Sequence, residues 1–238
     1  ATIKKASSKI NLVWAVGAPL QVDCRLYNCA VVFYRGNILG IAVKSYLPNY
    51  REYYESRQFS PASQAMATTV SLAGQKDIPF GANLIFQATN VKNMQLYFEI
   101  CEDVWVPVPP SSFAAMAGAT VIGNLSASNI TVGKSEYRHQ LIANQSARCV
   151  AAYLYADAGF GESTTDLAWD GHAMIYENGN LLAESDRFST SAQMILADID
   201  LDRLAQDRMR LTTFGRNAED HRENLQAFRR IEFEWASP

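Results

Sequence analysis

A single thiol, Cys101, stands where an apolar run gives way to a turn, and two acids follow it directly. Residues 96–100 are largely apolar and predict a buried strand, whereas the prolines of residues 106–110 exclude an immediate return to regular structure. A short alanine-rich helix is predicted to begin near Phe113, after a serine cap. Ligands of α/β proteins bind at the carboxyl ends of strands, so Cys101 is either a nucleophile or a small buried thiol of the core.

Lys44 is the residue best placed to assist such a thiol. A cysteine that attacks a carbonyl carbon needs a base for its proton and a donor for the developing oxyanion. Lys44 stands alone at the carboxyl end of the apolar run 38–43, ahead of an aromatic loop. It is either a solvent-exposed lysine at a strand end or an ammonium beside Cys101 that favours the thiolate and binds the oxyanion. His172, at the start of a predicted strand, is interpreted as structural.

The histidines and cysteines predict neither a metal site nor a disulfide scaffold. The three histidines form no His-x-x-x-His pair, and the sequence contains no Cys-x-x-Cys spacing. Cys24 and Cys29 flank a predicted turn and could pair with each other. We instead interpret all four cysteines as reduced thiols of a cytoplasmic protein.

Composition favours one large globular domain. The 238 residues are 48% hydrophobic and 19% charged, which is enough apolar material for a proper core. The net charge of -3 gives no electrostatic reason to expect a nucleic acid or an anionic membrane as partner. No apolar run reaches the length of about 18 residues that a membrane span needs. We therefore expect a cytoplasmic protein.

Alternating strands and helices with several hairpins indicate a mixed sheet covered by helices. Hairpins are predicted at the turn of Arg35 and Gly36 and at Asn178-Gly179. Strands are predicted at residues 12–16, 28–33, 38–43, 83–87, 96–100, 120–125, 151–156, 173–176, 180–183 and 193–199. Helices are predicted at residues 113–117, from Ser135 onward, and at 202–210, and a Gly/Ser/Thr loop at 159–166. Residues 211–238 are interpreted as a charged tail.

Five motifs resemble the nitrilase, or carbon-nitrogen hydrolase, superfamily. Residues 44–55 resemble its lysine motif, and Glu-Ile-Cys-Glu-Asp at residues 99–103 resembles its nucleophile motif. Residues 124–128, 161–171 and 177–185 agree with one branch, the amide-hydrolysing domain of bacterial glutamine-dependent NAD+ synthetases. The resemblance implies a single α/β domain over residues 1–238, folded as a four-layer α-β-β-α sandwich with mixed sheets. Residues 201–238 would form its C-terminal helix and charged tail. Superfamily members pair through their helical faces, which implies a homo-oligomer.

The superfamily uses a Glu-Lys-Cys triad, and the resemblance assigns roles to the positions that match its motifs. Cys101 would be the nucleophile and Lys44 the oxyanion-stabilising partner. The backbone N–H of Glu102 would be a second oxyanion donor, and Glu55 would position the lysine or the water. The positions that hold glutamine are matched by Tyr50, Ser128 and Lys134, and Trp105 falls where the branch places an aromatic wall.

These binding positions also have structural interpretations. Tyr50 and Trp105 could be packed aromatics, Ser128 a turn cap and Glu55 a solvated acid. Lys134 departs mildly from relatives that carry arginine, because an ammonium keeps the positive charge but loses bidentate geometry.

Two departures from the family pattern concern the ends of the chain. No residue matches the first glutamate of the triad, and residues 1–9 resemble the helix that follows it, so we expect a truncated sequence. No Gly-rich pyrophosphate loop is present. ATP and Mg2+ are therefore expected only in a separate synthetase domain, and no cofactor is expected in this segment.

The leading hypothesis is hydrolysis of the L-glutamine side-chain amide, with the ammonia used for ATP-dependent amidation of deamido-NAD+. A second hypothesis is a stand-alone amidase or nitrilase that acts on another small amide. The third is a non-catalytic scaffold, for which Cys101 would show ordinary thiol reactivity.

Overall fold

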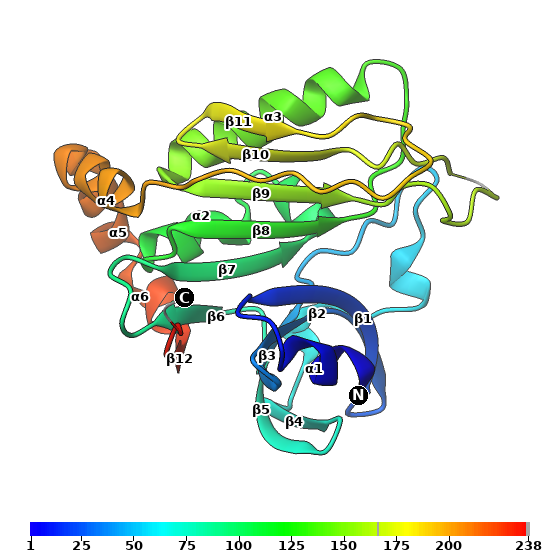
Figure 1. The fold of residues 1–238 in the computed structure, drawn as a ribbon, viewed down its shortest axis with the longest axis horizontal. Helices are drawn as coiled ribbons and strands as arrows, with labels where there is room; N and C mark the ends of the chain where they lie inside the picture. Colours follow the sequence, from blue (N-terminus) through cyan, green and yellow to red (C-terminus); the bar gives the residue numbers. More distant parts are fainter. Residues whose placement is uncertain (166, 237–238) are drawn as a thin grey trace.

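Two mixed β-sheets make up most of the fold, and the smaller one packs against part of the larger one (Figure 1). The computed structural model describes residues 1–165 and 167–236. Asp166, in the predicted Gly/Ser/Thr loop, and residues 237–238, at the end of the predicted tail, lie outside the described residues. Strands β2 and β3 of one sheet contact β7 of the other, so the sheets share a core.

The smaller sheet has the strand order β1-β2-β3-β5-β4, with β3 and β5 parallel and the other pairs antiparallel. Its strands are β1 (Trp14–Val22), β2 (Arg25–Tyr34), β3 (Asn37–Val43), β4 (Thr69–Leu72) and β5 (Gln75–Gly81). The predicted hairpin between β2 and β3 is present, and Arg35 and Gly36 both have positive φ at its turn.

The larger sheet has the order β11-β10-β9-β8-β7-β6-β12, and its centre, β7 to β9, is parallel. Its strands are β6 (Leu84–Ala88), β7 (Gln95–Ile100), β8 (Val121–Ser126), β9 (Ala152–Asp157), β10 (Ala173–Glu177), β11 (Asn180–Glu184) and β12 (Arg229–Phe233). The carboxyl ends of the three parallel strands therefore meet at one edge, which is where Cys101 follows β7.

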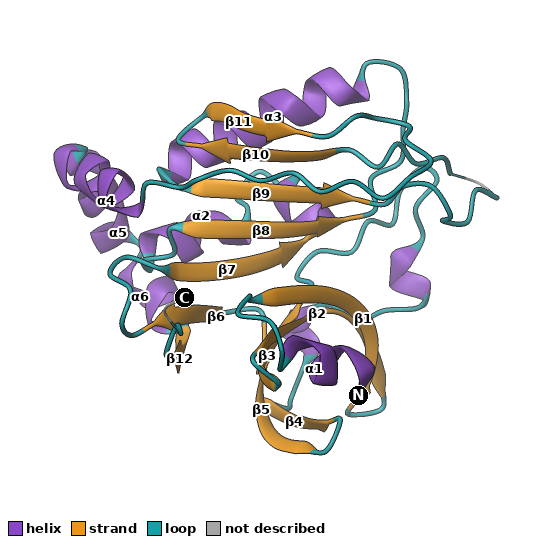
Figure 2. Ribbon diagram, in the orientation of Figure 1, coloured by secondary structure: helices purple, strands orange, loops and turns teal. Residues whose placement is uncertain are grey.

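Helices cover the outer face of the larger sheet (Figure 2). The helices are α1 (Thr2–Ser7), α2 (Pro110–Met116), α3 (Lys134–Cys149), α4 (Leu201–Arg210), α5 (Thr212–Asp220) and α6 (Arg222–Gln226). Short 3-10 turns are η1 (Glu55–Arg57), η2 (Ala62–Gln64) and η3 (Cys101–Val104). Helix α1 lies against β2 and β3 of the smaller sheet. The predicted α/β fold class with two mixed sheets is confirmed, with helices on the larger sheet and α1 beside β2 and β3 of the smaller one.

Strand β2 is apolar on both faces because each face meets a different core. Val31 and Phe33 belong to a cluster with β3 and β5, whereas Val32 and Tyr34 pack between the sheets with Phe86. This explains the unbroken apolar run in the sequence, since a strand buried on both sides shows no alternation. The same alternation places Ala30 of β2 and Ala42 of β3 against Ile100 and Cys101.

The predicted strand at residues 193–199 is wrong. This segment forms no ladder in the described structure, and Met194 and Leu196 are 81% and 75% exposed. Its apolar pattern satisfies local β-propensity, but a strand also needs a neighbouring edge to accept its hydrogen bonds.

Residues after 210, interpreted from the sequence as a charged tail, contain further regular structure. Helices α5 and α6 follow α4, and β12 pairs in parallel with β6 from Arg229 to Phe233. Scattered apolar residues explain this ordering, because Phe228 packs under the helices and Phe233 packs between the sheets.

Several element boundaries differ from the predictions, and two strands were not predicted. β1 continues through Pro19 to Val22. Proline cannot donate a ladder hydrogen bond, but β1 is an edge strand, where a missing N–H on the open side costs no such bond. Strands β4 and β5 were not predicted, although Ile78 and Phe80 belong to the core. α2 begins at Pro110 rather than Phe113, since proline fits the first helical position.

No helix within the described parts of the chain combines the length and apolarity that a membrane span requires.

Candidate active site

Cys101 occupies a strained turn at the carboxyl end of β7. Its φ is +47°, a left-handed conformation that is costly for a residue with a side chain. The Cys101 N–H donates to Asn124 Oδ1 at 3.1 Å, and the Ile100 N–H donates to Asp103 Oδ2 at 3.0 Å. Two side chains thus hold the backbone that presents the thiol, which is 9% exposed.

Lys44 and Glu55 form a buried ion pair beside this turn. Lys44 follows β3 directly, and its Nζ donates to Glu55 Oε2. The second carboxylate oxygen of Glu55 accepts from Asn28 Nδ2 at 2.8 Å. The side chains of Lys44 and Glu55 are only 3% and 14% exposed. Lys44 is therefore not a solvent-exposed lysine at a strand end, and Glu55 is not a solvated acid.

The charge of Lys44 acts on the Cys101 thiol. Burial raises the pKa of Cys101, while the ammonium of Lys44 and a backbone hydrogen bond from Ala127 lower it. Asp157 and Glu55 raise the same pKa through their negative charges. The resting thiol is therefore protonated, and Lys44 reduces the cost of forming the thiolate. Lys44, Glu55 and Cys101 all line one cavity of about 700 Å³.

A second cavity, of about 530 Å³, also opens on Cys101 and contains the predicted binding residues. The predicted site residues on its wall are Tyr50, Glu102, Trp105, Ser128 and Lys134. We call this space the head-group cavity. Tyr50 OH donates to Glu102 Oε1 at 2.8 Å, so the aromatic loop after β3 reaches the turn of Cys101.

Lys134 supplies a cation among aromatic rings in the head-group cavity. It is the first residue of α3, and its Nζ donates to Asn129 Oδ1. The Nζ lies 5.3 Å from the ring centre of Trp105 and 5.9 Å from that of Tyr53. Burial lowers the pKa of Lys134, and the nearby charge of Arg138 lowers it further. An incoming carboxylate would compensate this partly desolvated ammonium.

Ser128 presents a buried hydroxyl without a partner. The residue is 2% exposed, and its Oγ makes no hydrogen bond in the described structure. Its backbone is held on both sides, because Asp157 Oδ1 accepts from the Ser128 N–H at 2.7 Å and Arg138 donates to the Ser128 carbonyl at 3.3 Å. The hydroxyl caps no turn in the described structure, and Ser128 is one of the residues that line the head-group cavity.

The carbon-nitrogen hydrolase family model matches residues 1–209. The chain belongs to the carbon-nitrogen hydrolase family. The glutamine-dependent NAD(+) synthetase of Mycobacterium tuberculosis is 52% identical over 221 residues, which are 93% of this chain and 32% of that protein. The chain thus spans about a third of the length of such relatives.

Two solved structures extend the comparison. A glutamine-dependent NAD(+) synthetase from Cytophaga hutchinsonii is 30% identical, with a TM-score of 0.66 over 79% of this chain and 30% of that one. A carbon-nitrogen hydrolase from Helicobacter pylori shares the fold, with a TM-score of 0.70 at 16% identity over 95% of this chain and 75% of the other.

Two buried polar residues behind Cys101 of this carbon-nitrogen hydrolase were not assigned roles from the sequence. Glu99, on β7, accepts from the Ser111 N–H at 3.0 Å and from the hydroxyl of Tyr153. Asn124, on β8, accepts from the backbone N–H of Cys101, and its Nδ2 donates to the Tyr153 hydroxyl at 3.1 Å. Burial, together with the charge of Asp103, raises the pKa of Glu99 to about 7. Polar residues within apolar strands were the signal that could have identified them.

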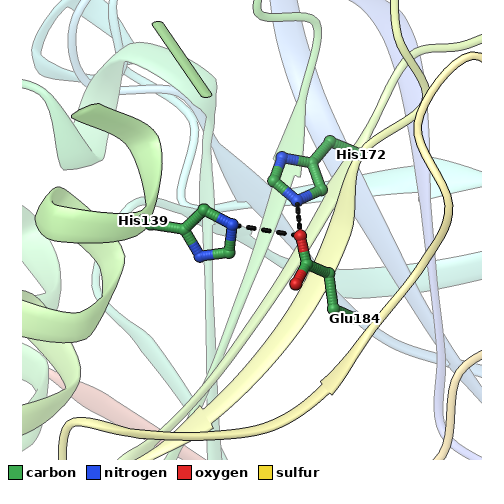
Figure 3. A group of neighbouring side chains, drawn as sticks. All are labelled: His139, His172 and Glu184. Carbon is green, nitrogen blue, oxygen red and sulfur yellow. Dashed lines mark hydrogen bonds and ion pairs between the residues drawn. The ribbon is translucent and has the colours of Figure 1, made fainter. Parts of the chain in front are cut away.

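Two histidines far apart in the sequence lie together in the hydrolase fold. Figure 3 shows His139 and His172 directed toward one carboxylate oxygen of Glu184. The ligand atoms of the three residues lie within 4.8 Å of one another. The spacing of these three residues in the sequence does not indicate that they are neighbours, because the packing of α3 against the β10–β11 hairpin brings them together. All four cysteines are free thiols, as predicted, and Cys24 is exposed.

Proposed function

We propose that this chain hydrolyses the side-chain amide of L-glutamine through a thioester on Cys101. One observation carries the proposal: Cys101 lines both the cavity of the Lys44–Glu55 pair and the head-group cavity with Lys134 and Ser128. The first cavity provides groups that act on an amide, and the second provides a cation and a hydroxyl suited to an amino-acid head group. The relatives' names, which specify glutamine dependence, support the same substrate.

The proposed reaction has two steps. The Cys101 sulfur bonds to the amide carbon, and the oxyanion is stabilised by the Lys44 ammonium and the Glu102 N–H. The C–N bond then breaks, and the nitrogen leaves as ammonia with the proton that the thiol gave up. Water adds to the thioester carbon, the C–S bond breaks, and glutamate is released while sulfur regains a proton. Glu55 keeps Lys44 oriented during both steps.

Selectivity for glutamine would come from the head-group cavity. The Lys134 ammonium would pair with the α-carboxylate, and the Ser128 hydroxyl would donate to it. Tyr50 and Trp105 would enclose the aliphatic part of the substrate. An amide without an α-carboxylate would lose the contact with Lys134, which separates this proposal from a general amidase.

We further propose that the ammonia serves an ATP-dependent synthetase domain that converts deamido-NAD+ to NAD+. The names of the mycobacterial and Cytophaga relatives support this, since both are NAD(+) synthetases much longer than the matched region. ATP and Mg2+ are assigned to that domain, and no cofactor is assigned to this chain. The proposal includes a cytoplasmic homo-oligomer.

The test is covalent labelling with a diazo-ketone analogue of glutamine, read by intact mass and peptide mapping. We expect one adduct on Cys101 that excess glutamine prevents, and none in Cys101→Ala. Lys134→Ala should abolish protection by glutamine but leave turnover of a simple aliphatic amide unchanged. Equal labelling of all four cysteines, or no adduct, would contradict the proposal and support a scaffold. Unchanged protection in Lys134→Ala would support a general amidase.

A further inference from the structure

Arg138 is a fully buried guanidinium that connects the head-group cavity to the histidine group. It is 0% exposed, and it donates to the Ser128 carbonyl at 3.3 Å and pairs with Asp157 Oδ2 at 3.2 Å. Asp157 in turn accepts from the N–H of Ser128 at 2.7 Å. Arg138 also pairs with Asp170 at 3.2 Å and contacts His172 Nδ1 at 3.0 Å. The backbone of Ser128 is therefore held by Arg138 directly and through Asp157.

The contact with Arg138 determines the protonation of His172. A guanidinium nitrogen can only donate, so His172 Nδ1 must accept. A neutral imidazole then carries its proton on Nε2, and this proton is donated to Glu184 Oε1 at 2.8 Å. Burial lowers the pKa of His172, and the charges of Arg138 and His139 lower it further, which agrees with the neutral form.

The same assignment argues against a metal ion at His139, His172 and Glu184. A cation bound there would need the lone pair of His172 Nε2, but that nitrogen carries the proton as long as Nδ1 accepts from Arg138. His139 has no such restriction, because its Nδ1 lies 2.7 Å from the Tyr176 hydroxyl, which can donate or accept. The group therefore offers two free ligand atoms rather than three.

We propose that His172 and Arg138 are positioning residues for the head-group cavity, with neutral His172 fixing the guanidinium that holds Ser128. This inference rests on the proposed function in one respect, namely that Ser128 contacts the substrate. Protonation of His172 would place an N–H donor and a positive charge against Arg138, which would displace the guanidinium and release Ser128.

The groups that face His172 come from several elements. Arg138 and His139 belong to α3, Tyr176 to β10 and Glu184 to β11, and Asp170 lies in the loop before β10. Arg187 neutralises Asp170 from outside, at 2.9 Å. Partial burial raises the pKa of Glu184, but hydrogen bonding to His172 and His139 leaves it below its ordinary value. Burial and the positive neighbours therefore outweigh the carboxylates of Glu184 and Asp170, and protonation of His172 is expected only below the ordinary histidine pKa.

Two substitutions separate the two nitrogens of His172. His172→Asn places a carboxamide oxygen near Nδ1, where it still accepts from Arg138 but cannot titrate. His172→Gln places its carboxamide near Nε2, keeps the contact with Glu184 and leaves Arg138 without that acceptor. We expect His172→Gln to raise the KM for glutamine by about tenfold with kcat unchanged, because a buried donor loses its partner. In the wild type, we expect acid to raise the KM as His172 becomes protonated. His172→Asn should have the wild-type KM at neutral pH and show no such rise, because its side chain cannot titrate.

Hydrogen–deuterium exchange of the peptide containing Ser128 provides a readout that needs no turnover. Exchange should be faster in His172→Gln and unchanged in His172→Asn. If the wild type does not hydrolyse glutamine, the proposed function fails, while the exchange rates still decide this inference. Should His172→Gln fail to fold, the inference is tested by the acid dependence of exchange. Acid should speed exchange of the Ser128 peptide in the wild type but not in His172→Asn. Equal effects of the two substitutions, or Zn2+ binding that requires both His172 and Glu184, would overturn the inference.

Discussion

Asp103 Oδ1 accepts a hydrogen bond from the backbone N–H of Ser45 at 3.1 Å. This contact joins the turn of Cys101 to the residue that follows Lys44, and the same oxygen accepts from the Tyr46 N–H at 2.9 Å. The other oxygen holds the Ile100 N–H. One buried carboxylate thus satisfies donors from both strand ends and fixes the turn of Cys101 relative to Lys44.

Asp103→Asn should destabilise the fold and disorganise the site. The amide nitrogen must face one of the backbone donors, so we expect a loss of about 2 kcal/mol in the free energy of unfolding. We also expect kcat for glutamine to fall by about tenfold where the variant is still folded, since the two strand ends can then separate. Urea denaturation and steady-state kinetics measure both effects. Asp220→Asn, at an exposed helix end, is the control and should change neither. Full activity in Asp103→Asn would contradict the role of this contact.

The strands around the site were predictable from sequence, but the contacts between them were not. Residues 96–100 and 38–43 are apolar runs long enough to predict buried strands, and each ends at a residue of the site. The link through Asp103 depends on how β3 packs against β7, which is set by two sheets and not by local sequence. The pairing of β12 with β6, and the meeting of His139 with His172, depend on long-range packing in the same way.

Cys101 should respond in opposite directions to changes in the ion pair beside it. Lys44→Met removes the cation that lowers the pKa of Cys101, so alkylation by iodoacetamide should slow by about tenfold. Glu55→Gln removes an anion that raises this pKa and retains a hydrogen-bond partner for Lys44, so alkylation should be as fast or faster.

Hydrolysis of glutamine should fall in both variants, because both disturb Lys44, the proposed oxyanion partner. Peptide mapping distinguishes Cys101 from Cys149, whose pKa burial raises to about 12 and which should stay unlabelled. Equal slowing of alkylation in the two variants would show that packing, and not charge, controls the reactivity of the Cys101 thiol.

Ser128→Ala should separate binding from stability. The Ser128 hydroxyl is buried without a partner, so its removal breaks no hydrogen bond and should leave the melting temperature unchanged or slightly higher. Substrate binding should nevertheless weaken, with KM for glutamine raised by about tenfold, if the hydroxyl donates to the head group. Thermal denaturation and steady-state kinetics on the same preparation test this. A lower melting temperature with unchanged KM would mean that the hydroxyl is structural.

Glu99 should make stability depend on pH. Its folded-state pKa of about 7 lies above the ordinary value of 4.5, so the folded protein retains a proton that the unfolded chain loses. The stabilisation from this proton is complete below the unfolded pKa and is lost as pH rises through the folded one. Glu99→Gln cannot titrate, so between about pH 5 and about pH 8 the wild type should lose about 2 kcal/mol of unfolding free energy relative to the variant. Urea denaturation of both proteins across this range measures the difference. A constant difference would show that Glu99 is ionised throughout, with Ser111 and Tyr153 as sufficient donors.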